Sequence, residues 1–290
     1  MKFSYYPGCA LKASAKEYDM SAREVLEHLD VELTEIEDWS CCGATAVYNI
    51  NKTLSYALPA RNLAIAEKKG LDIAVPCPVC YYWLWKTKES SEDDSKLMEE
   101  INTALNGTRL KYSGGIGVKH ILEILAEDIG IEKIKDNVKK PLEGLRVAPY
   151  YGCFVVKPPR KKRFDSPENP TSMDKIISAT DATLVEWDMK TRCCGGAGML
   201  TNEEVMLKLT YEILKRAKEL EADCVVTLCP QCSMALDAKQ RDVDREYKEK
   251  IGIPVLYFTQ LLGLSFGIDP KKLGIDKNIV PAKKIVNSVL

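Results

Sequence analysis

The stretch Thr191–Gly198, TRCCGGAG, places two cysteines side by side and two glycines directly after them. A second pair of adjacent cysteines occurs within residues 40–45, SCCGAT. Adjacent cysteines do not easily bridge to each other, and two neighbouring thiolates rarely reach one zinc ion in good tetrahedral geometry. Both stretches therefore indicate a site that uses sulfur atoms from neighbouring residues.

The two cysteine pairs belong to an internal duplication. Each copy contains a single cysteine, then Cys-Cys-Gly, then Cys-Pro-x-Cys. An offset of 152 residues relates the last four cysteines of the copies, which are Cys41, Cys42, Cys77 and Cys80 in the first and Cys193, Cys194, Cys229 and Cys232 in the second. The leading cysteines, Cys9 and Cys153, are offset by 144 residues, so the second copy carries eight extra residues before its Cys-Cys-Gly. This agreement predicts two homologous domains, which we place at residues 1–140 and 141–290 with a polar linker near the boundary.

The composition is that of an ordinary soluble protein. The chain of 290 residues has 41 basic and 42 acidic residues, so its net charge of −1 gives no reason to expect nucleic acid or an anionic membrane as a partner. The first residues lack the apolar core of a secretory signal, and the apolar stretch Ile253–Ile268 is too short to span a bilayer. We therefore expect a cytoplasmic protein without membrane insertion.

The cysteine content indicates metal binding or redox chemistry. The sequence contains 11 cysteines and only 2 histidines. In a reducing compartment a disulfide scaffold is not expected, so metal binding or redox chemistry becomes the leading interpretation. A metal site in this chain must be built mainly from thiolates.

Short apolar segments alternate with helical periodicity in both copies. The segments expected to form buried strands are residues 1–6, 31–36, 72–76, 146–151, 183–187 and 224–228. The segments expected to form helices are residues 21–29, 58–69 and 203–220. This alternation predicts an α/β fold of two duplicated, Rossmann-like parallel-sheet domains related by pseudo-twofold symmetry. Open parallel sheets gather their ligands at the carboxyl ends of the strands, which is where the cysteines of each copy fall.

Five cysteines in each copy are one more than a structural zinc or an ordinary cubane 4Fe–4S cluster requires. The surplus, with two sulfurs from adjacent residues, suits a polynuclear iron–sulfur cluster in which neighbouring thiolates bind different irons. A four-cysteine zinc or cubane site with one spare buried cysteine is the alternative, because surplus buried cysteines are common. Sequence physics alone leaves both interpretations open.

The motifs YYPGC, SCCGA, CPVC, YYGC, RCCGGAG and CPQC resemble those of the cysteine-rich CCG-domain family, and closely those of its heterodisulfide reductase B subunits from methanogens. The resemblance covers essentially the whole chain. It implies two non-cubane 4Fe–4S clusters, one held by Cys9, Cys41, Cys42, Cys77 and Cys80 and the other by Cys153, Cys193, Cys194, Cys229 and Cys232. These ten cysteines would then also be the catalytic residues, through the clusters that they hold.

The resemblance also implies an activity and a set of partners. The activity is reduction of the coenzyme M–coenzyme B heterodisulfide to two thiols in methanogenesis. The implied partners are a ferredoxin-like iron–sulfur subunit (heterodisulfide reductase C) and a flavin-containing subunit (heterodisulfide reductase A), together with a hydrogenase or formate dehydrogenase. The family also includes subunits of succinate or fumarate reductases and of lactate or glycolate oxidases, so an iron–sulfur electron-relay subunit is the alternative function.

The densest basic run, KPPRKKR at residues 157–163, follows Cys153 and has no counterpart after Cys9. A charge run is usually a solvated face, but this asymmetry makes Lys157, Arg160 and Arg192 our candidates for binding the anionic groups of the substrate. The tyrosines that precede the leading cysteines are expected to pack in the core. His120 is expected on an amphipathic helix, with a role in local hydrogen bonding rather than in chemistry.

Overall fold

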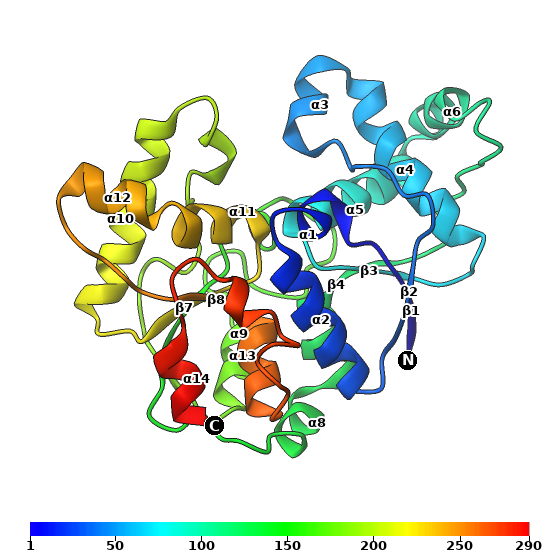
Figure 1. The fold of residues 1–290 in the computed structure, drawn as a ribbon. Helices are drawn as coiled ribbons and strands as arrows, with labels where there is room; N and C mark the ends of the chain where they lie inside the picture. The colour runs from blue at the N-terminus through cyan, green and yellow to red at the C-terminus, as the bar shows by residue number, and fades with distance from the viewer. Residues whose placement is uncertain (290) are drawn as a thin grey trace.

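Two four-stranded parallel sheets organise the chain, one in each half (Figure 1). The computed structural model describes residues 1–289. The first sheet has the order β2-β1-β3-β4 and consists of β1 (Lys2–Tyr5), β2 (Glu32–Glu35), β3 (Ile73–Val75) and β4 (Val118–His120). The second sheet has the equivalent order β6-β5-β7-β8 and consists of β5 (Arg146–Tyr150), β6 (Thr183–Leu184), β7 (Cys224–Thr227) and β8 (Val255–Tyr257). The predicted α/β fold of two duplicated parallel-sheet domains is confirmed.

Helices follow most of the strands and cover the sheets. Those of the first half are α1 (Gly8–Lys12), α2 (Lys16–His28), α3 (Ala44–Ile50), α4 (Lys52–Glu67), α5 (Pro78–Asp93), α6 (Ser95–Ala104), α7 (Ile121–Glu123) with a π-helical continuation to Ile129, and α8 (Ile131–Asp136). Those of the second half are α9 (Ser172–Ser178), α10 (Glu203–Glu219), α11 (Pro230–Ser233) with a π-helical continuation to Ala238, α12 (Gln240–Tyr247), α13 (Phe258–Ser265) and α14 (Lys283–Val289). Short 3₁₀ turns occupy Gly196–Gly198 and Ile275–Lys277.

The predicted strands and helices are present, with shifted ends, and the fourth strand of each sheet is an addition. Strands β4 and β8 run directly into α7 and α13, so their apolar residues are not separated in the sequence from those of the helix that follows. His120 is the last residue of β4 and not part of a helix, so its predicted placement was wrong. Its ring nitrogen Nδ1 accepts a hydrogen bond from the backbone N–H of Leu122, which caps α7.

The two halves exchange contacts reciprocally. Helix α2 of the first half packs on α13 of the second (Figure 1). Helix α9 of the second half packs on α7 of the first. Since α2 corresponds to α9 and α7 to α13, each half offers the other the same pair of elements, as a twofold relation requires. The Oγ of Ser21 in α2 lies 2.7 Å from the Oγ1 of Thr259 in α13, so a buried hydrogen bond joins the halves.

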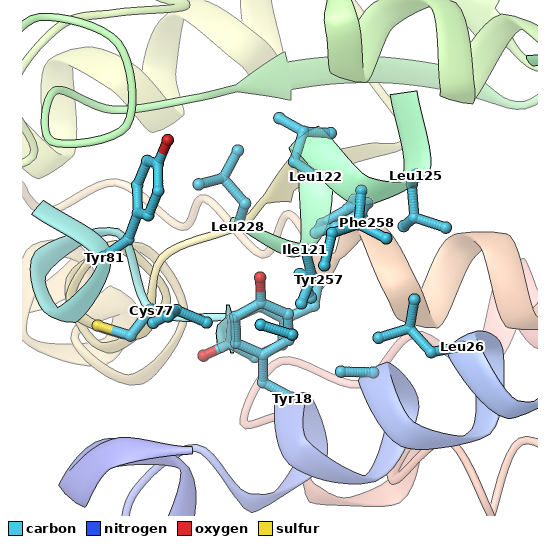
Figure 2. Packing of buried hydrophobic residues seen from close by; sticks show 14 of the residues in the cluster. Tyr18, Leu26, Cys77, Tyr81, Ile121, Leu122, Leu125, Leu228, Tyr257 and Phe258 are labelled. Atoms are coloured by element: carbon cyan, nitrogen blue, oxygen red, sulfur yellow. The ribbon is translucent and has the colours of Figure 1, made fainter. Parts of the chain in front are cut away.

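A pair of stacked tyrosines lies at this interface (Figure 2). The rings of Tyr18 from α2 and Tyr257 from β8 are parallel within 4°, with centroids 4.1 Å apart, and both are buried. They belong to a hydrophobic cluster that also includes Leu26 of the first half and Phe258 of the second. One core therefore spans both halves and holds the sheets in a fixed relation.

Residues 137–145 connect the halves. The backbone N–H groups of Lys139 and Lys140 both donate to the carbonyl of Ser265 at the end of α13. The domain boundary between residues 140 and 141 stays a prediction. Within residues 1–289, no helix has the length and apolar character to cross a membrane.

Candidate functional site

The ten repeat cysteines gather in two sets, one at the carboxyl edge of each sheet. In the first half, Cys9 follows β1, the pair Cys41–Cys42 follows β2, and Cys77 and Cys80 follow β3 at the start of α5. The second half repeats this order: Cys153 follows β5, Cys193 and Cys194 follow β6, and Cys229 and Cys232 follow β7 at the start of α11. Parallel strands end at a common edge, so three loops deliver five sulfurs to one place in each half.

Pairs of sulfurs within each set lie close to one another. In the first set, the Sγ atoms of Cys9 and Cys41 are 3.8 Å apart, and those of Cys42 and Cys80 are 3.4 Å apart. In the second set, Cys194 and Cys232 are 3.5 Å apart. Among residues 1–289, no group of three or more His, Cys, Asp or Glu side chains is arranged to hold a single metal ion.

Each set has a buried side and an open side. The exposed or half-buried cysteines are Cys9, Cys41, Cys153 and Cys193, and the buried ones are Cys42, Cys77, Cys80, Cys194, Cys229 and Cys232. The leading cysteine and the first cysteine of the adjacent pair therefore face outward in both halves. A molecule that approaches either set from solvent meets these sulfurs first.

Backbone N–H groups point at the sulfurs of the adjacent pairs. The N–H of Gly43 donates to Cys41 Sγ and the N–H of Gly195 to Cys193 Sγ, each over 3.4 Å. Both glycines adopt left-handed backbone angles, with φ of 81° at Gly43 and 76° at Gly195. Glycine reaches this conformation without steric cost, which explains why each cysteine pair is followed by glycine.

Gly8 and Gly152 leave room for a sulfur atom. Both have positive φ, and a Cβ at Gly8 would lie 2.9 Å from Cys80 Sγ. A Cβ at Gly152 would lie 3.0 Å from Cys232 Sγ. The residue before each leading cysteine therefore allows the backbone to approach the last cysteine of the same set, and a larger residue would push that sulfur away.

Two tyrosine hydroxyls hold the cysteine-pair loops at equivalent positions. Tyr6 donates to the carbonyl of Ser40 over 2.8 Å, and Tyr150 donates to the carbonyl of Arg192 over 2.6 Å. Each carbonyl belongs to the residue directly before an adjacent cysteine pair. Both tyrosines are buried, as predicted, but the polar role was missed. Their equivalent placement before Cys9 and Cys153 was the available signal, because a buried tyrosine hydroxyl usually finds a partner.

Two further side chains fix the loop before Cys77. The carbonyl of Pro76 accepts the Tyr18 hydroxyl over 3.1 Å and lies 2.7 Å from His120 Nε2. Burial lowers the pKa of His120 to about 3, so the imidazole is neutral and donates through Nε2 while Nδ1 accepts from backbone. The expectation that His120 serves local hydrogen bonding is confirmed.

The electrostatics of the second set favour a thiolate at Cys193. A hydrogen bond from Cys153 is the main cause that lowers the Cys193 pKa to about 6, against the opposing effect of burial. The backbone N–H of Gly195 and the positive charge of Lys157 lower the pKa further. Lys157 therefore lies within electrostatic range of the open side of this set.

The three predicted anion-binding residues occupy different surroundings. Lys157 and Arg192 are both exposed. Arg160 is half-buried, and its guanidinium lies over the rings of Tyr81 and Trp85 in the first half. Lys157 and Arg192 are therefore open to solvent beside the second set. Arg160 instead contacts aromatic rings of the first half.

The two sets face a common interface. Tyr82, two residues after Cys80, packs edge-to-face against Phe154, the residue after Cys153, with ring centroids 5.7 Å apart. The stacked pair of Tyr18 and Tyr257 lies at the same interface, with Cys77 beside it (Figure 2). Helices and loops that carry cysteines of one set therefore contact those that carry cysteines of the other.

The chain matches a known family over both halves. The family model for the cysteine-rich domain, CCG, matches residues 3–85 and 147–237. The 8-methylmenaquinol:fumarate reductase membrane anchor subunit of Wolinella succinogenes is 37% identical over 98% of this chain and 99% of its own length. The B subunit of the ferredoxin/F420H2-dependent CoB–CoM heterodisulfide reductase of Methanosarcina acetivorans is 31% identical over 96% of this chain and 94% of its own length.

A solved structure shares the fold. The crystal structure of a hypothetical protein from Helicobacter pylori superposes with a TM-score of 0.77 at 15% identity and covers 97% of this chain. This chain spans about half of that longer one, 52%. At this identity the likeness concerns the fold alone.

The substitution Gly152→Ala should disrupt the second set more than backbone strain alone explains. Gly144→Ala is the matched control, because Gly144 also has a positive φ but nothing lies within 4 Å of the position that an alanine methyl group would take there. Both variants should lose about 1–2 kcal/mol of stability from the left-handed conformation. Gly152→Ala should lose about 1–3 kcal/mol more from overpacking against Cys232. Equal denaturation midpoints for the two variants would show that Cys232 is not crowded.

Removing the Tyr150 hydroxyl should loosen the second cysteine pair only. Tyr150→Phe deletes the hydrogen bond to the Arg192 carbonyl and should cost about 0.5–1.5 kcal/mol. In metal-free protein, Cys193 should then react faster with a thiol reagent, while Cys41 keeps its wild-type rate, as mapped by mass spectrometry. Tyr6→Phe is the control and should show the reverse pattern. Unaltered rates in both variants would mean that these hydroxyls do not position the pairs.

Proposed function

The chain belongs to the cysteine-rich CCG domain family, and we propose that it is the iron–sulfur subunit of an oxidoreductase complex that reduces the coenzyme M–coenzyme B heterodisulfide to two thiols. The observation that carries the proposal is the pair of complete five-cysteine sets on either side of one interface. Reduction of a disulfide consumes two electrons and two protons and yields two thiols. Two one-electron centres beside one substrate match that requirement.

The residues present fit an iron–sulfur cluster in each set. Five thiols converge, backbone N–H groups already donate to their sulfurs, and Gly8 and Gly152 leave space beside the last cysteine of each set. Hydrogen bonds to ligand sulfurs are among the means by which a protein sets the potential of such a cluster. We propose that each set holds one non-cubane 4Fe–4S cluster. When bound, the clusters supply electrons and Lewis-acidic iron for cleavage of the sulfur–sulfur bond.

The chain's own residues would orient the substrate. Lys157 and Arg192 are accessible beside the second set, and Lys157 is near enough to Cys193 for its positive charge to lower the pKa of that thiol. A sulfonate or phosphate group is readily held by such cations, and arginine binds it through two donors. We propose that these two residues anchor the anionic ends of the disulfide, with its sulfurs toward the open side formed by Cys153 and Cys193.

We propose that the electrons come from another subunit. All ten repeat cysteines are engaged in the two sets, and the closely spaced cysteines of a ferredoxin domain do not occur in the sequence. We propose a ferredoxin-like iron–sulfur partner, in turn supplied by a flavin-containing subunit and by a hydrogenase or formate dehydrogenase. The exposed cysteines of each set give that partner a short approach to both clusters.

The identity to the Wolinella succinogenes subunit favours a second candidate function. That relative is named as a membrane anchor subunit of a fumarate reductase, and it matches this chain over nearly its whole length. In this alternative the two sets relay electrons between a donor and a separate catalytic subunit and bind no disulfide. Turnover of the heterodisulfide by the purified complex distinguishes the two functions.

The metal content of anaerobically purified protein should be about eight iron and eight sulfide per chain, since each set is proposed to hold a four-iron cluster. Cys41→Ala should lower the iron content to about half and leave the signals of the second cluster intact. Cys224→Ala is the control, because this buried cysteine of β7 lies outside both sets. Two zinc ions without sulfide, or loss of all iron in Cys41→Ala, would contradict the assignment.

Arg192→Ala should raise the Michaelis constant for the heterodisulfide at least tenfold while the iron content stays at the wild-type value. A charge-assisted contact contributes about 1.5–3 kcal/mol, and each 1.4 kcal/mol corresponds to about tenfold in affinity. Lys157→Ala should act in the same direction. Arg216→Ala, which removes an exposed arginine paired with Asp188, is the control. Wild-type kinetics in the Lys157 and Arg192 variants would show that these two residues do not bind the anionic groups of the substrate.

A further inference from the structure

The basic run at residues 157–163, here called the basic strap, crosses from the second half and lies along α5 of the first half. It contacts residues of α5 that are spaced four apart and therefore follow one side of the helix. These residues are Tyr81, Trp85, Glu89 and Asp93. The acidic residues that pair with this basic run therefore belong to the same chain.

Arg160 and Lys161 make the contacts. The guanidinium carbon of Arg160 lies 4.3 Å from the ring centre of Tyr81 and 4.9 Å from that of Trp85. The backbone N–H of Lys161 donates to Glu89 over 2.9 Å, and its ammonium group lies 2.5 Å from Asp93. The Lys161–Asp93 pair is exposed and contributes little, whereas a guanidinium stacked on two aromatic rings is a stronger contact.

Arg160 also holds the loop that carries the second set. Its terminal nitrogen donates to the carbonyl of Phe154 over 3.2 Å. Phe154 directly follows Cys153, and Tyr81 directly follows Cys80. One guanidinium thus joins the residue after a cysteine of the second set to the residue after a cysteine of the first.

We propose that Arg160 is a positioning residue that sets the spacing between the two cysteine sets. The proposal rests on the proposed function, in which two clusters act on one substrate. The geometry of Arg160 determines how far the start of α5, with Cys80, lies from the Cys153 loop. It acts through Tyr81 and Phe154 and does not itself need to touch the substrate.

The surroundings of Arg160 differ from those of a solvated surface charge. Its Nε is buried and has no hydrogen-bond partner among the described residues, and leaving a buried donor unpaired is unfavourable. Burial also lowers the pKa of Arg160. The Arg160 side chain thus loses solvation and one hydrogen bond in the position where it contacts the aromatic rings.

The contact depends on properties that lysine lacks. A guanidinium is planar, stacks on aromatic rings and offers several donors in a fixed arrangement, whereas an ammonium group is a compact, strongly hydrated charge. The first copy has no basic run after Cys9. The second half therefore contacts the first through this run, and among the described residues the first half makes no equivalent contact with the second. Arg160→Lys therefore keeps the charge but should lose the positioning effect.

The test compares Arg160→Lys and Arg160→Gln with Lys161→Gln, which removes only the exposed pair with Asp93. Two quantities are measured besides activity: amide hydrogen exchange at the first turn of α5 and in the loop after Cys153, and the magnetic interaction between the reduced clusters, seen in EPR relaxation. Both Arg160 variants should bind the wild-type amount of iron. Exchange at both places should rise about tenfold or more as the local contact opens, and the magnetic interaction should change. Lys161→Gln should match wild type.

Wild-type exchange and wild-type magnetic interaction in both Arg160 variants would overturn the proposal. A raised Michaelis constant as the only change would also overturn it and would assign Arg160 to anion binding with Lys157 and Arg192. If the wild-type protein holds no iron, the proposed function fails. The exchange measurement then still decides whether Arg160 links α5 to the Cys153 loop.

Discussion

The crowding of five cysteine sulfurs at the end of each sheet is the constraint on which the rest of the structure depends. Sulfurs as close as 3.4 Å leave no room for a side chain at Gly8 or Gly152. The loops that carry the sulfurs must also be held in place by groups that do not occupy the space between the sulfurs. Backbone N–H groups at left-handed glycines and buried tyrosine hydroxyls meet this need, because they hold the loops from outside the sulfur set.

Duplication gives two such sets, and the reciprocal packing of α2 on α13 and α9 on α7 brings them to a common interface. The symmetry ends at the basic strap, which exists only in the second half. The eight additional residues of that half lie between its leading cysteine and its adjacent pair, and the strap lies within the same interval. An asymmetric contact between symmetric halves distinguishes the two sets, and in the proposed function only the second set lies beside the residues that bind the anionic groups.

Much of this arrangement could be predicted from the sequence. Constant cysteine spacing predicted two equivalent sets, and apolar segments predicted the three strands whose carboxyl ends carry them. The fourth strands were missed, and His120 was placed on a helix, because β4 and β8 lead directly into α7 and α13 and their apolar residues merge with the helical pattern. The roles of Tyr6, Tyr150 and Arg160 depend on contacts between distant segments. A phenol or a guanidinium in sequence gives no sign of which carbonyl or ring it will meet.

Each half of the chain should hold its own multi-iron cluster, with both clusters at one interface. Anomalous diffraction at the iron absorption edge, from crystals of anaerobically purified protein, would locate the iron without reference to activity. We predict two separate groups of iron, one among Cys9, Cys41, Cys42, Cys77 and Cys80 and the other among Cys153, Cys193, Cys194, Cys229 and Cys232. A single metal ion in each set, or iron in only one of them, would contradict this arrangement.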